Sequence, residues 1–198
     1  LDSQVATLLL SQTVNIMSEG ELIQLQRRYD IGLSESDYFD IIERKTASLC
    51  AASCRLGAVF AGANRKVADM LYNYGLKIGI AFQIVDDCLD VMGSEDEIGK
   101  SLNTDIQKGK LTLPLIRLVN TLPSHKLETT KELIFQHTAK ETKNTILDLL
   151  TEHDAVEYAF NTARKIVRQA QDEIAPLPDS PYKTNLIELA DYIVSRRS

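Results

Sequence analysis

Cysteine is scarce in this sequence: the 198 residues include only Cys50, Cys54 and Cys88. They form no CxxC pair and have no histidines spaced as partner ligands, which disfavours both a disulfide framework and a zinc site. We therefore expect three small buried thiols in a reducing cytosol.

Long apolar runs are also absent. No stretch reaches the length of about 18 apolar residues that a membrane span needs, and no charged-then-apolar leader opens the chain. We expect a protein without a transmembrane segment, located in the cytoplasm. An organellar leader removed upstream would change that compartment.

Clusters of positive charge are missing as well. The formal net charge is −6, and no run of lysine and arginine or basic strip with interleaved aromatic residues occurs. A nucleic-acid surface needs such a cluster to neutralise phosphates, so we expect no nucleic-acid partner.

Apolar and polar residues alternate with period two in no convincing window, and no long repeat is visible. Helical spacing of apolar residues is common instead, and 44% of the residues are apolar, enough for a sizeable core. The pattern predicts an all-α helical bundle in which residues 1–198 form a single domain. The expected helices span residues 5–25, 34–60, 66–92, 113–119, 127–135, 140–150, 155–174 and 182–195, with an irregular loop over 93–113 and a stiff turn at Pro176, Pro178 and Pro181.

Three carboxylates recur in the otherwise apolar stretch Gly79–Asp90. At about 100° per residue, four polar side chains share one helix face within roughly 100° of arc: Gln83, Asp86, Asp87 and Asp90. Carboxylates held this close repel one another unless a cation lies among them. Oxygen ligands without histidine or cysteine suit Mg²⁺, usually held together with a substrate phosphate. The alternative, an exposed acidic helix, is disfavoured because apolar residues surround the acids too densely for a free surface.

Two glycine-flanked lysines follow this predicted helix. Gly99-Lys100 and Gly109-Lys110 lie in the polar loop, with Asp105 between them. Ammonium groups on such a loop can close over a polyphosphate that a metal already bridges. Helix and loop together predict a diphosphate-binding site.

The order and spacing of these residues resemble a known family. The stretch from Phe82 to Pro114 contains F-Q-x-x-D-D-x-x-D, then Gly-Lys, then D-x-x-x-G-K-x-T-L-P. Together these resemble the second aspartate-rich region of the trans-isoprenyl (polyprenyl) diphosphate synthases, whereas an isolated DDxxD is common on solvated helices. The closing residues 189–197 are also similar to the C-terminus of that family. The resemblance implies an isoprenoid-synthase-type helical bundle.

The resemblance also implies roles for individual residues. Lys45-Thr46 is similar to the mid-helix Lys-Thr pair of the family, whose lysine faces the allylic diphosphate; without that match, a lone helical lysine would be read as solvated. The small residues that follow this pair would let neighbouring helices or a prenyl chain approach closely. On this resemblance the catalytic residues are Lys45, Thr46 and Gln83, the substrate-binding residues are Lys45, Thr46, Phe82, Gln83, Lys100 and Lys110, and the metal ligands are Asp86, Asp87 and Asp90.

Gly20 interrupts the first predicted helix. A glycine inside a helix costs about 1 kcal/mol relative to alanine, which indicates that a backbone or a ligand lies close to this position. The resemblance would turn Glu21 and Gln24 toward the catalytic cavity. A packing glycine beside exposed polar residues explains the same residues equally well.

The resemblance implies a Mg²⁺-dependent prenyltransferase. Such an enzyme condenses isopentenyl diphosphate with an allylic prenyl diphosphate to give an all-trans polyprenyl diphosphate. Mg²⁺ would lie between Asp86, Asp90 and the allylic diphosphate, and the lysines would stabilise the departing pyrophosphate.

Two features of the family are missing. The family has two aspartate-rich motifs on facing helices, but this sequence has no second Asp-Asp pair, and the N-terminal basic residues that hold isopentenyl diphosphate are also absent. The chain therefore resembles the C-terminal portion of a synthase. We expect it to be inactive alone and to form a homodimer or pair with a separate N-terminal piece. Two alternatives stay open: a non-catalytic partner subunit of a prenyl synthase, and a class I terpene cyclase, whose second metal site usually has an Asn/Ser/Glu triad.

Overall fold

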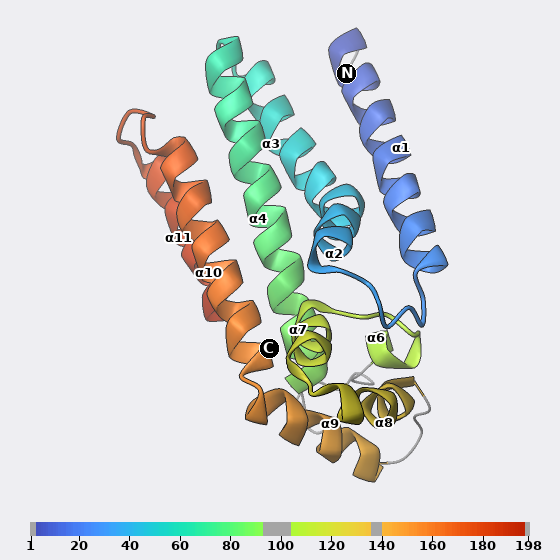
Figure 1. The fold of residues 1–198 in the computed structure, drawn as a ribbon. Coiled ribbons are helices and arrows are strands. Elements are labelled where there is room, and N and C mark those ends of the chain that lie inside the picture. Colours follow the sequence, from blue (N-terminus) through green and yellow to red (C-terminus); the bar gives the residue numbers. More distant parts are fainter. Residues whose placement is uncertain (1–2, 93–103, 136–139, 197–198) are drawn as a thin grey trace.

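The computed structural model describes residues 3–92, 104–135 and 140–196, and every regular element in these ranges is helical (Figure 1). The α-helices are α1 (Gln4–Gln26), α2 (Glu35–Ile42), α3 (Ser48–Phe60), α4 (Arg65–Met92), α6 (Thr104–Gln107), α7 (Leu113–Thr121), α8 (Ser124–Phe135), α9 (Lys140–Glu152), α10 (Ala155–Ile174) and α11 (Pro181–Ser195). A π-helical turn, η1 (Glu43–Ala47), joins α2 to α3. The all-α prediction is confirmed for the described part of the chain.

Helix α4 lies at the centre of the bundle. It packs against α3 on one side and α10 on the other, and α11 also contacts it (Figure 1). α1 lies beside α3 and η1, while α8 and α9 lie at the end of the bundle where α4 finishes. The acidic motif is on the last turns of α4, so the fold places it close to α6 and α7.

The burial of α4 explains its sequence pattern. Its buried residues recur every three or four positions and cover a wide arc, because α3 and α10 both pack on it. The buried side chains of this helix are Ala68, Tyr74, Ile78, Ala81, Ile84, Val85, Asp87, Cys88 and Val91.

Two glycines allow α4 to approach its neighbour closely. A Cβ atom at Gly75 would lie 2.6 Å from the carbonyl oxygen of Cys50, and one at Gly79 would lie 2.5 Å from Cα of Ala47. Only hydrogen fits in these gaps, since core atoms are already in contact. The small residues predicted after Lys45-Thr46 therefore serve close helix packing.

Side-chain caps fix the start of α2. The hydroxyl of Ser34 accepts the backbone N–H of Asp37 at 3.1 Å, and the Asp37 carboxylate accepts the backbone N–H of Ser34 at 3.3 Å. This reciprocal capping box satisfies two backbone donors that a helix start leaves unpaired. It holds in place the helix that carries Tyr38.

Two predictions of local structure are wrong. The irregular loop predicted over 93–113 contains α6, where the Gly109 N–H donates to the Ile106 carbonyl at 2.8 Å and closes the turn. Residues 93–103 of that loop lie outside the described residues. Pro181, predicted as part of a turn, is the first residue of α11, where a proline without an N–H loses no helical hydrogen bond.

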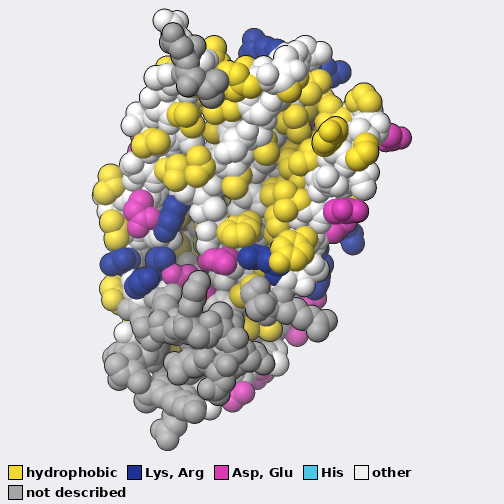
Figure 2. All heavy atoms as spheres, turned by 180° about the vertical axis from the view of Figure 1, so that it is seen from behind, with side chains coloured by type: hydrophobic (Ala, Val, Ile, Leu, Met, Phe, Trp, Pro, Cys, Tyr) yellow, Lys and Arg dark blue, Asp and Glu magenta, His cyan; other side chains and the backbone are white. Residues whose placement is uncertain are grey.

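Helix α1 exposes many large apolar side chains, interspersed with polar ones. Its buried residues are Ala6, Thr13 and Gly20, so only a narrow stripe contacts the bundle. Its exposed large apolar residues are Val5, Leu8, Leu10, Val14, Ile16, Leu22 and Leu25. Hydrophobic side chains are spread over much of the face shown in Figure 2. None of the described helices combines the length and the hydropathy of a membrane span.

Candidate functional site

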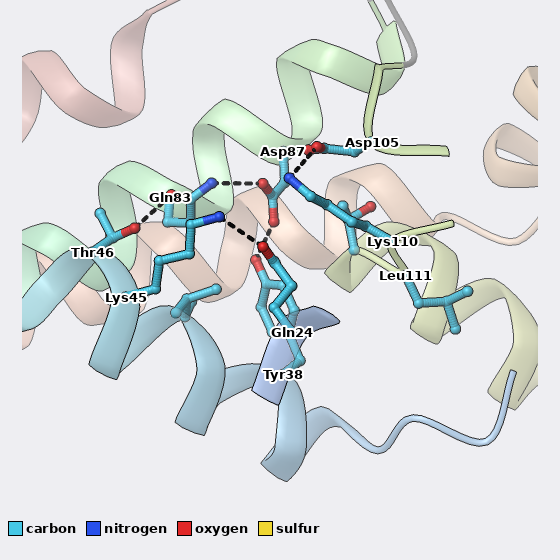
Figure 3. A pocket seen from close by; sticks show the side chains of 11 residues that line it. Gln24, Tyr38, Lys45, Thr46, Gln83, Asp87, Asp105, Lys110 and Leu111 are labelled. Atoms are coloured by element: carbon cyan, nitrogen blue, oxygen red, sulfur yellow. Dashed lines mark hydrogen bonds and ion pairs between the residues drawn. The ribbon is translucent and has the colours of Figure 1, made fainter. Parts of the chain in front are cut away.

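A small pocket lies where α1, α2, η1, α4 and residues 105–112 meet (Figure 3). Its empty volume is about 330 Å³. The lining side chains are Gln24, Tyr38, Ile42, Lys45, Thr46, Gln83, Asp87, Asp105, Lys110, Leu111 and Thr112. Five of the residues predicted for the site from the sequence thus meet in one place, although they come from three separate segments.

The π-helical turn brings Lys45 and Thr46 to this pocket. Such turns insert one residue into a helix, redirect the side chains around it and are frequent at functional sites. Helix α1 backs the turn closely, since a Cβ atom at Gly20 would lie 2.7 Å from the backbone nitrogen of Lys45. The close backbone approach predicted at Gly20 is confirmed.

Polar groups of α1 hold the Lys45 ammonium. Its Nζ donates to Oε1 of Gln24 at 2.6 Å and pairs with Oε2 of Glu21 at 2.8 Å. The hydrogen bond from Lys45 lowers the pKa of Glu21. The ammonium group therefore has a fixed direction before any ligand binds.

A chain of hydrogen bonds crosses the pocket from η1 to α2 (Figure 3). The Thr46 hydroxyl donates to Oε1 of Gln83 at 2.9 Å, and Nε2 of Gln83 donates to Oδ1 of Asp87 at 2.8 Å. The Tyr38 hydroxyl donates to the other oxygen of Asp87, Oδ2, at 2.6 Å. Four side chains are thus fixed relative to one another.

The Asp87 carboxyl group is buried, with 4% of the residue exposed. Burial raises the pKa of Asp87 to about 7, while the hydrogen bonds from Tyr38 and Gln83 act in the opposite direction. The neighbouring charges of Asp105 and Asp86 raise this pKa further. A carboxylate is tolerated here because both of its oxygens accept a hydrogen bond.

Asp86 and Asp90 have different surroundings from Asp87. Asp86 is exposed and Asp90 is half-buried, with its Oδ2 accepting the backbone N–H of Asp105 at 3.3 Å. Positions 86 and 90 lie about one helical turn apart on the same face of α4. Asp87 instead points inward toward α2.

The donor set of Asp86 and Asp90 suits Mg²⁺. Within the ranges that the structure covers, no three carboxylate, imidazole or thiol groups converge into a complete metal site. Mg²⁺ is commonly held by one or two carboxylates and completes its octahedron with water and substrate phosphate. Two hard oxygen ligands beside a lysine-lined pocket fit that mode of binding.

Lys110 lies across the pocket from Lys45 and has a fixed partner of its own. Its Nζ lies 2.7 Å from Oδ1 of Asp105, and the two side chains are 18% and 16% exposed. Next to them, the hydroxyl of Thr112 is buried without a hydrogen-bond partner among the described residues. Lys100, predicted to bind substrate, lies outside the described residues.

Phe82 does not line the pocket. Its side chain is partly exposed, and the guanidinium of Arg196 lies 4.4 Å from the centre of its ring. Its role in substrate binding stays a prediction. Tyr38 does line the pocket, but its sequence neighbours Ile41 and Ile42 make it look like an ordinary core residue.

Three proteins similar to this chain bear on the site. Octaprenyl diphosphate synthase of Haemophilus influenzae is 34% identical over 99% of this chain and 60% of its own length. Heptaprenyl diphosphate synthase component 2 of Bacillus subtilis is 32% identical over 96% of this chain and 53% of its own length. A crystal structure of polyprenyl synthase from Caulobacter crescentus, complexed with calcium and isoprenyl diphosphate, matches with a TM-score of 0.93 and 33% identity, covering 100% of this chain and 60% of that one.

These similarities cover nearly the whole chain but only part of each relative. The chain spans 60% of the first relative's length. The structural match confirms the isoprenoid-synthase-type helical bundle expected from the sequence. The profile of the polyprenyl synthetase family matches residues 2–150, which is most of the chain, and the chain therefore belongs to this family.

Proposed function

We propose that residues 1–198 form one domain of a trans-polyprenyl diphosphate synthase, the portion that holds the second aspartate-rich motif. The intact enzyme condenses isopentenyl diphosphate with an allylic prenyl diphosphate and extends an all-trans chain. The observation that carries the proposal is that Lys45, Thr46, Gln83 and Lys110 line one pocket beside the acidic end of α4. Relatives named as octaprenyl and heptaprenyl diphosphate synthases support it.

The two lysines of the pocket bind the allylic diphosphate. Each ammonium is already oriented, Lys45 by α1 and Lys110 by Asp105, so little reorganisation is needed when phosphate oxygens arrive. Positive charge placed where negative charge develops lowers the barrier to breaking the C–O bond, and removing one such group typically costs about 10²–10³-fold in rate. Asp86 and Asp90 would hold Mg²⁺, which when bound would supply further neutralisation of the departing pyrophosphate.

Thr46 and Gln83 face the allylic cation with oxygen atoms. The Thr46 hydroxyl donates its hydrogen bond to Gln83, so the lone pairs of its oxygen remain available to the pocket. The electron pair of the broken C–O bond leaves with pyrophosphate. The double bond of isopentenyl diphosphate then forms the new C–C bond, and the proton lost from that unit goes to pyrophosphate.

The proposed site has metal ligands on one side only. Facing carboxylates are not found among the described residues, where no complete metal cluster occurs. We propose that a second polypeptide or a further segment supplies them, that the mature assembly is a homodimer or includes such a piece, and that this chain alone makes no elongated product. One relative is itself named as a component of a synthase, which supports the need for a partner.

Prenyl transfer assays test this function. The chain is incubated with Mg²⁺, labelled isopentenyl diphosphate and geranyl or farnesyl diphosphate, alone and together with a synthase segment that carries the first aspartate-rich motif. Elongated product is expected only in the mixture. Product from the chain alone would contradict the one-sided site, and hydrocarbon formed without isopentenyl diphosphate would favour a terpene cyclase. No product in either case would favour the non-catalytic subunit.

A pair of matched variants tests the metal ligand. In the active mixture, Asp86→Ala is expected to lower the rate by about 10²-fold or more, because ligand charge and orientation are lost together. Asp69→Ala removes another partly exposed acid of α4, far from the pocket, and is expected to stay near the unmodified rate. Similar rates for both variants would remove Asp86 from the proposed site.

A further inference from the structure

Both oxygens of the buried Asp87 carboxylate are hydrogen-bonded within the protein. Each of its oxygens accepts one strong hydrogen bond, from Tyr38 at 2.6 Å and from Gln83 at 2.8 Å. Asp86, the adjacent acid, is exposed. A metal ion at Asp87 would have to share a buried carboxylate with these two donors, whereas Asp86 is open to solvent.

The contact with Asp87 determines which way the Gln83 amide is turned. In its ionised form the Asp87 carboxylate can only accept hydrogen bonds, so Gln83 must then present its NH₂ group to Asp87. The Gln83 carbonyl oxygen is then on the opposite side, where the Thr46 hydroxyl donates to it at 2.9 Å. With the amide reversed, the NH₂ group of Gln83 would face Thr46 and its carbonyl oxygen would face the carboxylate of Asp87. Two accepting oxygens would then meet with no hydrogen between them.

Tyr38 secures this arrangement from α2. It is 3% exposed, and burial together with the charge of Asp87 raises the pKa of Tyr38 well above its ordinary value. The phenol therefore keeps its proton and remains a donor. Its contact with Asp87 joins residues 49 positions apart in the sequence.

We propose that Asp87, anchored by Tyr38, is a positioning residue that fixes the Gln83 amide with its carbonyl oxygen toward Thr46 and the pocket. The orientation of the amide follows from the hydrogen bonds alone. Its consequence, an oxygen dipole that faces a developing allylic cation, rests on the proposed function. Asp87 thus differs in role from Asp86, although the two are adjacent in the motif.

The variant Asp87→Asn tests the orientation with almost no change of shape. The substituted side chain has one accepting oxygen and one donating NH₂ group, and it carries no charge. The NH₂ group of Gln83 therefore loses its charged acceptor, and the Gln83 amide is no longer restricted to one orientation. Side-chain amide signals in ¹H–¹⁵N spectra report this change, with Gln83→Met identifying the Gln83 pair. A large shift of that pair in Asp87→Asn is expected, and an unchanged pair would overturn the proposal.

Binding of Mg²⁺ with inorganic pyrophosphate separates positioning from metal ligation. Calorimetry is expected to show weaker binding for Asp86→Asn by about tenfold or more, and binding within a few-fold of the unmodified chain for Asp87→Asn. Equal losses for the two variants would show that Asp87 is a metal ligand and would overturn the proposal. Thermal unfolding of each variant verifies that it is folded.

Ligand charge provides the link to the reaction. A prenyl analogue with an ammonium group in place of the reacting carbon is compared with its uncharged counterpart, both with Mg²⁺ and pyrophosphate. The preference for the charged analogue is expected to fall about tenfold in Asp87→Asn and less in Tyr38→Phe, which keeps the Asp87–Gln83 contact. An unchanged preference in Asp87→Asn would overturn the proposed consequence. If the unmodified chain shows no preference for the charged analogue, the proposed stabilisation of an allylic cation is wrong. The amide spectra would still test the orientation of the Gln83 side chain independently.

Discussion

Gly79→Ala adds one methyl group at the closest contact between α4 and the η1–α3 segment. The new carbon would lie 2.5 Å from Cα and 2.9 Å from Cβ of Ala47, and 3.2 Å from Cβ of Cys50. Carbon atoms are normally about 3.5–4.0 Å apart in contact. Neither a backbone atom nor a Cβ atom can rotate away, so the two helices must separate by about 1 Å to reach that distance.

The expected cost follows from two opposing effects. Overpacking of a close-packed core costs about 1–3 kcal/mol, and the neighbours of Gly79 are rigid, which places this site in the upper part of that range. Alanine returns about 1 kcal/mol through its higher helix propensity. We expect a net loss of about 2 kcal/mol in the free energy of unfolding, which for a chain of this size lowers Tm by about 4–8 °C.

The same separation reaches the pocket. The hydrogen bond of 2.9 Å between Thr46 and Gln83 spans this interface, next to Ala47 and one turn beyond Gly79. Lengthening it by about 1 Å would break it. In an active assembly, a misplacement of that size is expected to lower the rate by about 10²-fold.

Gly57→Ala is the matched control. Gly57 lies in α3, and a Cβ atom there would have no neighbour within 4 Å. This variant should gain up to about 1 kcal/mol from helix propensity. Urea and thermal unfolding of both variants measure the difference. If Gly79→Ala were as stable as Gly57→Ala, the close approach of α4 to η1 would be refuted.

Three further predictions concern titration, an ion pair and association. Burial raises the pKa of Asp87 from 3.8 to about 7, so the folded state binds the proton of the Asp87 carboxyl group more tightly than the unfolded state does. The stability that this proton contributes is complete below about pH 4. It declines between about pH 4 and pH 7, by at most about 1.4 kcal/mol per pH unit. Asp87→Asn should remove that slope in urea unfolding at successive pH values, and identical slopes would contradict it. Lys77→Met should lower the free energy of unfolding by about 1 kcal/mol, because the ion pair of 2.8 Å between Lys77 and Glu173 is partly buried and joins α4 to α10. Thermal unfolding at low and high salt measures this loss. An unchanged stability would show that solvent screens the pair. The chain alone should self-associate through the apolar surface of α1, and Leu8→Lys with Leu22→Lys should reduce this in sedimentation; a monomeric unmodified chain at high concentration would disprove it.

Helix positions were largely predictable because apolar spacing reflects which side chains are buried. The clearest case is α10, predicted over residues 155–174 and observed at Ala155–Ile174. Its buried residues recur every three to four positions, as a helix with one face on α4 requires. The short helix α6 carries no such signal, since a single turn closed by Gly109 is too short to show a period.

The site was predictable only in part. Charged and polar residues of a motif can be identified in a sequence by their type and spacing. Lys45, Gln83 and Lys110 were identified in this way, and they do line one pocket. The π-helical turn is too short to show a period in the sequence, so its effect on the direction of Lys45 is visible only in the fold. The same is true of Tyr38, whose contact with Asp87 depends on how α2 packs against α4.

The state of the site depends on how firmly α1 is attached. Gln24 and Glu21 of this helix orient the Lys45 ammonium, so the direction of that charge is as stable as the docking of α1. That docking rests on a narrow stripe of small buried residues, while seven large apolar side chains of α1 are exposed. A polypeptide that covered this surface would bury apolar area, stabilise α1 and thereby hold Lys45 more firmly in the direction that Gln24 and Glu21 set. Under the proposed function, the docking of α1 would therefore couple assembly to the orientation of Lys45 in the pocket.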